Sequence, residues 1–169
     1  MTLSMYEASA PRFVSMLKNL GAILDKAQAH AAAKKIDPGV LLAARLFPDM
    51  LPLARQVQIA CDHAKGAAAR LAGMDVPKYE DDEQSFEDLK ARIAKTIAFV
   101  ESVKAGQIDG SEEREITFKA GGGRDLTFKG MPYLLSYAYP NFYFHVVTAY
   151  SILRHNGLEI GKRDYIGNP

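Results

Sequence analysis

The sequence predicts an all-α fold, a bundle of four helices with a small β-hairpin inserted before the last helix. Apolar residues recur at spacings of three and four in four separate segments, which is typical of amphipathic helices. This period gives way to strict alternation only between Arg114 and Lys129. The chain has 169 residues, of which 48% are hydrophobic and 24% charged, so we expect one globular domain over residues 1–169.

The first predicted helix covers about residues 4–30. Its apolar stripe consists of Tyr6, Phe13, Leu17, Leu20, Leu24 and Ala27. Ser4 and Glu7 have the spacing of a capping box at its start. Pro11 requires the helix to begin late or to bend there. A turn at residues 36–39 follows, and a short helix could then span residues 40–47.

The second and third helices follow from the same pattern. The second begins near Pro48–Pro52 and ends at Gly73, and its alanines would let another helix approach closely. Its stripe consists of Leu53, Val57, Ala60, Ala64, Ala67 and Leu71. An acidic loop precedes the third helix, for which Ser85 is a suitable N-cap with Asp88 in the first turn, and Gly106 ends it. Its stripe consists of Phe86, Leu89, Ile93, Ile97, Val100 and Lys104.

Two alternating runs, residues 115–119 and 125–129, share a Thr-Phe-Lys core and are joined by three glycines at 121–123. Alternation on both sides of a glycine turn predicts a β-hairpin between about Glu113 and Lys129. A phosphate-binding loop is disfavoured, because no Gly-Lys-Ser/Thr follows the glycines.

The fourth helix is predicted from about Pro132 to His155, where Asn156-Gly157 stops it. One seam runs through Leu135, Ala138, Phe142, His145, Ala149 and Ile152. Pro140 lies within this segment, so the helix either kinks there or starts afresh at that residue.

The charge balance excludes some classes of function. Lys and Arg number 21 and Asp and Glu 20, a net charge of +1, which disfavours nucleic acid as a partner. The single cysteine, Cys61, cannot form an intrachain disulfide and should pack as a small hydrophobe. No run of eighteen apolar residues predicts a membrane span, and residues 1–7 do not resemble a secretory signal. We therefore expect a cytoplasmic protein.

Two histidines are the main candidates for a site. His145 lies in the seam of the fourth helix, and His63 borders the buried face of the second. Facing helices of a bundle can build a metal site, but zinc or nickel usually takes three protein ligands. The alternative is that both are core histidines bonded to a Tyr, a Gln or a backbone carbonyl. Five tyrosines near the fourth helix could line a pocket, cover the kink or form a partner interface: Tyr133, Tyr137, Tyr139, Tyr143 and Tyr150.

The run Pro-Asn-Phe-Tyr-Phe-His-Val-Val-Thr-Ala-Tyr-Ser-Ile-Leu-Arg-His-Asn-Gly at 140–157, with Gly-Lys-Arg-Asp-Tyr at 161–165, resembles the carboxy-terminal signature of the DUF1993 family. Ser4-Met5-Tyr6 and Phe13-Val14 agree with the same family. DUF1993 proteins are of unassigned function and are similar to the DinB/YfiT-like superfamily of four-helix bundles. Many proteins of that superfamily are thought to be metalloenzymes, and they often dimerise.

The resemblance implies a zinc or nickel site with one histidine on the second helix and two on the last, four residues apart. His63 and His145 match two of these positions, and the third falls at Ala149, which cannot ligate. Some members are thiol-dependent transferases. Two functions remain open. The protein could bind a small ligand in the bundle cleft, using His63, His145 and tyrosines such as Tyr150. Alternatively, it could be a non-enzymatic homodimeric interaction module.

Overall fold

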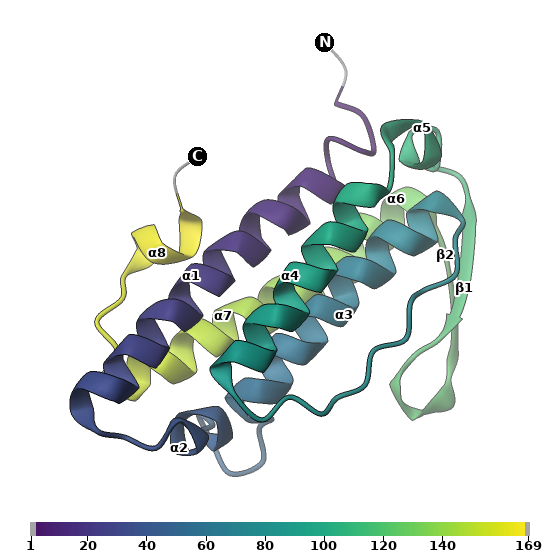
Figure 1. Ribbon diagram of the computed structural model, residues 1–169. Coiled ribbons are helices and arrows are strands. Elements are labelled where there is room, and N and C mark those ends of the chain that lie inside the picture. Colours follow the sequence, from purple (N-terminus) through teal and green to yellow (C-terminus); the bar gives the residue numbers. More distant parts are fainter. Residues whose placement is uncertain (1–2, 168–169) are drawn as a thin grey trace.

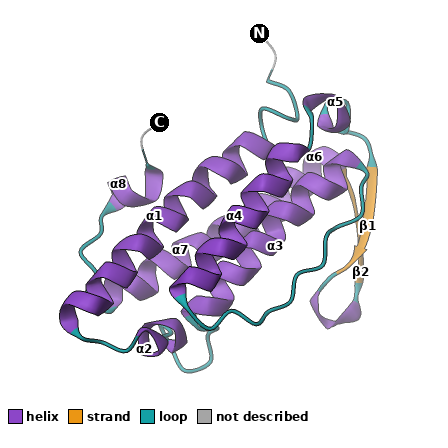
Figure 2. Ribbon diagram, viewed as in Figure 1, coloured by secondary structure: helices purple, strands orange, loops and turns teal. Residues whose placement is uncertain are grey.

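The computed structural model describes residues 3–167 and contains four long helices that pack side by side (Figure 1). They are α1 (Ala10–Lys34), α3 (Leu53–Ala72), α4 (Phe86–Ser102) and α7 (Tyr139–His155). Helices dominate the described chain, and one two-stranded sheet precedes the last long helix (Figure 2). The predicted fold class is therefore confirmed.

The order of the helices explains the longest connection. α3 packs against both α4 and α7, and α1 packs against α4. α3 and α4 run in the same direction, so the loop at residues 73–85 carries the chain back along the bundle between them (Figure 1). Such a crossover is one of the known ways to connect four packed helices.

The core is made by the predicted apolar stripes. Phe13, Leu17 and Leu20 of α1 are fully buried, as are Ala60 and Ala64 of α3. Buried alanines let neighbouring backbones approach closely, which suits a helix with partners on two sides. Cys61 is also fully buried, as expected of a small hydrophobe.

Some helix boundaries differ from the predicted ones. α1 begins at Ala10 rather than near residue 4, with Pro11 in its first turn. The Ser4 hydroxyl does accept a hydrogen bond from the backbone N–H of Glu7 (3.2 Å), but in a turn that precedes the helix. α4 is capped as predicted by the Ser85 hydroxyl, which accepts from the N–H of Asp88 (3.0 Å), but ends at Ser102 rather than at residue 106.

Three short helices lie outside the four long ones. α2 (Pro38–Ala43) is capped by Asp37 and is shorter than the predicted 40–47. α5 (Ala105–Ile108) follows α4. α8 (Lys162–Ile166) lies on α1, where the Asn19 amide donates to the carbonyls of Tyr165 and Ile166 at 3.0 and 2.8 Å.

The predicted hairpin is confirmed. β1 (Glu115–Lys119) and β2 (Asp125–Lys129) are antiparallel, and Thr117 lies opposite Thr127. Gly122 and Gly123 have positive φ angles of 80° and 77°, which side chains rarely adopt. Phe118 and Phe128 share one face and pack against the hydrophobic core.

The last helical segment is continuous but contains one wide turn. α6 (Gly130–Tyr133) leads into a π-helical turn at Leu134–Ala138, and α7 then begins with Pro140 in its first turn. A π turn takes one more residue than an α turn, and it rotates everything before it around the helix axis. The predicted seam is therefore correct from Ala138 onward but wrong for Leu135, which is 54% exposed while Leu134 is buried.

No helix within residues 3–167 combines the length and the hydropathy needed to cross a membrane.

Candidate functional site

The two candidate histidines come together between α3 and α7. The ring centroids of His63 and His145 lie 5.8 Å apart, and the ring planes differ by 15°. Both side chains are half-buried. The sequence analysis placed His145 in the seam of its helix and His63 at the border of the buried face of another, and the two rings do meet between these helices.

His145 is oriented by a buried glutamine. The Gln56 amide oxygen lies 2.7 Å from Nδ1 of His145, and the Gln56 amide nitrogen donates to the Leu51 carbonyl at 3.0 Å. A carbonyl oxygen can only accept, so the Leu51 bond fixes which end of the amide faces the histidine. Nδ1 of His145 therefore carries the proton in the neutral ring, and Nε2 keeps a lone pair for another partner.

Both imidazoles are kept neutral at pH 7. Burial, together with the nearby His145 and Arg70, lowers the pKa of His63 to about 4, and the carboxylate of Asp62 opposes this shift. Burial also lowers the pKa of His145 below its usual range. A neutral imidazole can accept a hydrogen bond or a proton, which is the state that ligand binding at Nε2 requires.

The buried state of His63 should make stability depend on pH. The unfolded chain takes up a proton on His63 near pH 6.5, whereas the folded chain does so only near pH 4. Stability is therefore fully present above pH 6.5 and is lost as the pH falls towards 4, by about 2 kcal/mol after allowance for partial exposure. Urea unfolding at pH 7 and pH 4.5 measures this loss.

Carboxyl groups also make the free energy of unfolding depend on pH. The contribution of His63 is therefore measured by comparing the wild type with a variant that lacks this histidine. His63→Gln should show a smaller loss than the wild type between pH 7 and pH 4.5. His155→Gln removes an exposed imidazole at the end of α7 and should keep the wild-type loss. An equal loss of stability in the wild type and in His63→Gln would contradict the conclusion that His63 is neutral in the folded protein.

Aromatic rings form one wall beside the histidines. The Tyr137 ring packs edge-on against His63 with centroids 6.0 Å apart. Phe118 and Phe128 of the hairpin lie 5.2 and 5.4 Å from Tyr137. The hairpin, far from α3 in the sequence, thus contributes to the surroundings of His63.

The other predicted tyrosines have different contacts. Tyr133 is buried, and Tyr139 donates to the Ala8 carbonyl and packs on Phe13. Tyr150, predicted from sequence as a ligand-binding candidate, packs against Tyr165 of α8 at 6.1 Å. Five residues separate it from His145, which places it about 140° around α7. Among residues 3–167, the tyrosine whose ring contacts the histidine pair is Tyr137.

The histidine pair does not complete a site for a resident metal ion. The third position of the expected ligand set is Ala149, which is fully buried and carries only a methyl group. Within residues 3–167 no three His, Cys, Asp or Glu side chains are grouped to hold a metal. Burial also raises the pKa of the Cys61 thiol to about 12, so it offers no thiolate. A zinc or nickel site with three protein ligands does not fit these residues.

Elemental analysis of the untagged purified protein checks this. We expect far less than one equivalent of zinc or nickel per chain, because two imidazoles alone hold these ions weakly. One tightly held equivalent that survives dialysis against a chelator, and is lost in His145→Phe, would contradict this expectation.

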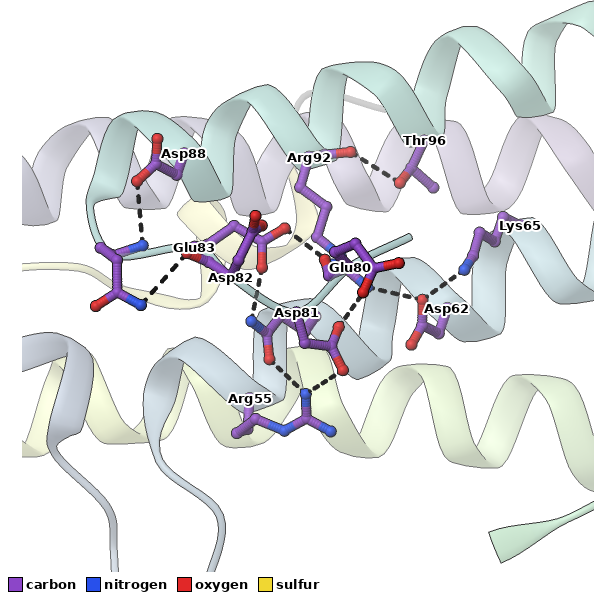
Figure 3. A network of polar contacts seen from close by, with 12 residues as sticks. Arg55, Asp62, Lys65, Glu80, Asp81, Asp82, Glu83, Asp88, Arg92 and Thr96 are labelled. Atoms are coloured by element: carbon purple, nitrogen blue, oxygen red, sulfur yellow. Dashed lines mark hydrogen bonds and ion pairs between the residues drawn. The ribbon is translucent and has the colours of Figure 1, made fainter. Parts of the chain in front are cut away.

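A second polar cluster was not predicted from the sequence (Figure 3). Arg92 of α4, with a side chain only 2% exposed, pairs with Asp62 at 2.9 Å, Asp81 at 3.0 Å and Glu83 at 2.8 Å. Lys65 pairs with the same Asp62 at 2.7 Å. Two carboxylates of the acidic loop, those of Asp81 and Glu83, are therefore bound to α4.

This cluster has a structural role. Arg55 extends it on α3, bonding both Gln58 (2.7 Å) and Asp81 (2.5 Å). A surface cavity of about 520 Å³ lies beside the loop, between residues 78–83 and α4. Arg55 of α3 and Arg92 of α4 both pair with Asp81 of the loop, and the described residues offer no hydrogen-bond partner to the buried Nε of Arg92. The evident effect of the network is to fasten the crossover loop across α3 and α4.

Comparison with known proteins agrees with this architecture. A family model described as "Domain of unknown function (DUF1993)" matches residues 5–166. The structure is similar to the crystal structure of a DinB family member protein from Shewanella denitrificans, with a TM-score of 0.88 and 42% sequence identity. That match covers 97% of this chain and 92% of the other. No curated protein sequence matches the chain.

Proposed function

The chain belongs to the DUF1993 family, and from that premise we propose that it binds a small ligand between α3 and α7, at His63 and His145. The observation that carries the proposal is the Gln56 contact, which commits Nδ1 of His145 and leaves Nε2 with a lone pair. A ligand at this position would donate a hydrogen bond from a hydroxyl, an amide or a protonated nitrogen.

The surroundings also favour a ligand over a closed core. Both imidazoles retain partial exposure, and the aromatic wall of Tyr137, Phe118 and Phe128 gives the pair an apolar side. Ligand sites commonly combine a few fixed polar groups with aromatic walls.

Saturation-transfer NMR with a collection of small polar fragments tests the proposal. We expect hits whose binding is lost in both His63→Phe and His145→Phe and kept in His155→Phe. Histidine ring signals of the wild type should shift with the same hits. Hits that survive both substitutions, or the absence of hits, would sink the proposal.

A second candidate function, a homodimeric interaction module, is favoured by one observation. The last helical segment carries large apolar side chains on its outer surface: Leu135, Phe144 and Val147 are 54%, 57% and 44% exposed. Pro140 is exposed between them. With the π turn taken into account, these four positions follow one another along one face, which is the pattern of a helix that packs on a partner.

Dimerisation through this face gives a testable expectation. Light scattering in the micromolar range should report twice the 18.6 kDa mass of the chain. Val147→Lys should weaken the dimer at least tenfold, because it places a charge in an apolar interface. Val40→Lys, at a similarly exposed position in α2, serves as the control and should leave the mass unchanged. A monomer at all concentrations would rule this function out.

A further inference from the structure

We propose that Arg70 gives the histidine site a preference for ligands that carry an anionic oxygen group, either a carboxylate or a phosphate. The inference rests on the proposed function and specifies its ligand class. It depends on where the Arg70 guanidinium lies, on what holds it there and on the absence of a carboxylate partner.

Arg70 is on the same helix face as His63. Seven residues separate them on α3, which is nearly two full turns. The Arg70 side chain folds back towards His63 over Gly66, because a Cβ built on Gly66 would overlap Nη1 of Arg70. The guanidinium therefore lies about one helical turn from the position of His63. The charge of Arg70 also acts on the imidazole of His63. It is one of the causes that lower the pKa of His63, and it is smaller than burial and the effect of His145.

The guanidinium is held by the aromatic wall. Its central carbon lies 4.4 Å above the Phe118 ring centroid, and Nη1 donates to the hydroxyl of buried Tyr133 at 3.1 Å. Tyr133 and Phe118 both contact Tyr137, which in turn contacts His63. One continuous set of rings thus positions Arg70 and lines the histidine pair.

Arg70 differs from the other inward-facing cations. Arg92 and Lys65 are each paired with carboxylates, whereas no carboxylate within residues 3–167 lies within ion-pair distance of Arg70. The hydrogen bond to Tyr133 uses only Nη1, and the half-buried side chain leaves further donors for a partner. A planar guanidinium with free donors matches the geometry of a carboxylate or a phosphate, and low surrounding polarity strengthens that pairing.

Titration with inorganic phosphate and, separately, with sodium acetate tests this. The readouts are the Arg Nε–Hε signals and the histidine ring signals in ¹H–¹⁵N NMR spectra at constant ionic strength. We expect saturable shifts of the Arg70 and His63 signals with at least one of the two anions. The anion that produces the shifts, phosphate or acetate, shows whether the site takes a phosphate or a carboxylate group.

Three variants make the result specific. Arg70→Gln should weaken anion binding at least tenfold. Gly66→Ala keeps the charge but places a methyl group where Nη1 lies, so the guanidinium must move, and binding should weaken in a protein that folds normally. Arg124→Gln, in the exposed hairpin turn, removes an equal charge and should bind as the wild type does.

The outcomes separate this inference from the function on which it rests. Unchanged anion binding in Arg70→Gln, or no binding of either anion to the wild type, overturns the role of Arg70. If fragments still bind in a histidine-dependent manner in that case, the proposed function stands without it. Loss of binding in Arg70→Gln and Gly66→Ala, but not in Arg124→Gln, supports the inference.

Discussion

Replacing Arg92 with methionine is expected to lower the free energy of unfolding by about 3–5 kcal/mol. The side chain of Arg92 is 2% exposed and faces three carboxylates, of which Glu83 is only 9% exposed. Methionine fills similar space but leaves Glu83 without its ion pair in a site that water hardly reaches. Asp62 and Asp81 are more exposed, so the loss of their ion pairs with Arg92 lowers the stability less.

Urea unfolding followed by far-ultraviolet circular dichroism measures this change. Lys119→Ala is the matched control, because Lys119 and Asp125 form an ion pair whose two side chains are both largely exposed. That variant should lie within about 0.5 kcal/mol of the wild type. If Arg92→Met were as mild as Lys119→Ala, the buried network could not be what fastens residues 73–85 to the bundle.

Replacing Gly130 with alanine should have the second large effect, a decrease of about 3 kcal/mol in the free energy of unfolding. Gly130 begins α6 directly after the hairpin, and a Cβ there would overlap the backbone oxygen of Ser111. Backbone cannot rotate aside as a flexible side chain can. The neighbouring bond from the Met131 N–H to the Glu112 carbonyl (3.0 Å) would be strained by the same displacement.

Gly106→Ala provides the control for this substitution. A Cβ at Gly106 meets nothing within 4 Å, and the residue lies in a helix, so alanine should be neutral or slightly stabilising there. Thermal unfolding of the two variants under identical conditions is sufficient. Equal midpoints would mean that the segment around Ser111 yields freely and that the contact is not a constraint.

The convergence of His63 and His145 could be predicted because both positions follow from regular helical periodicity. His63 could be assigned to a helix face by counting four from Ile59 and three from Ala60. His145 could be assigned by counting three from Phe142 and four to Ala149. The caps at Ser85 and Gly73 were equally predictable, since each depends on local backbone chemistry. Where structure is local or periodic, one sequence was sufficient.

The π-helical turn could not be predicted in the same way. Leu135 fits the seam by counting, and nothing in the residue pattern reveals that the turn before Pro140 takes an additional residue. The Arg92 network was missed for another reason. Its partners Asp62, Asp81 and Glu83 come from a helix and a loop whose relative placement depends on tertiary packing.

The roles of Gln56 and Arg70 had a sequence signal that was not used. They lie seven residues before and seven after His63, so all three occupy one face of α3. A glutamine, a histidine and an arginine aligned on the inward side of a helix rich in alanine are polar groups in need of partners. Examining heptad neighbours of a candidate histidine would have found both.

The π-helical turn at Leu134–Ala138 also determines how far α6 and the hairpin before it are rotated about the axis of α7. Deleting one residue there, such as Ser136, would convert the segment to an ordinary α-helix and rotate α6 by about 100° relative to α7. The hairpin is joined directly to α6, so Phe118 and Phe128 would swing away from Tyr137 while His63, His145 and Gln56 stayed in place. Loss of a single residue at this point would thus remove the hairpin part of the aromatic wall from the site and leave its two imidazoles where they are.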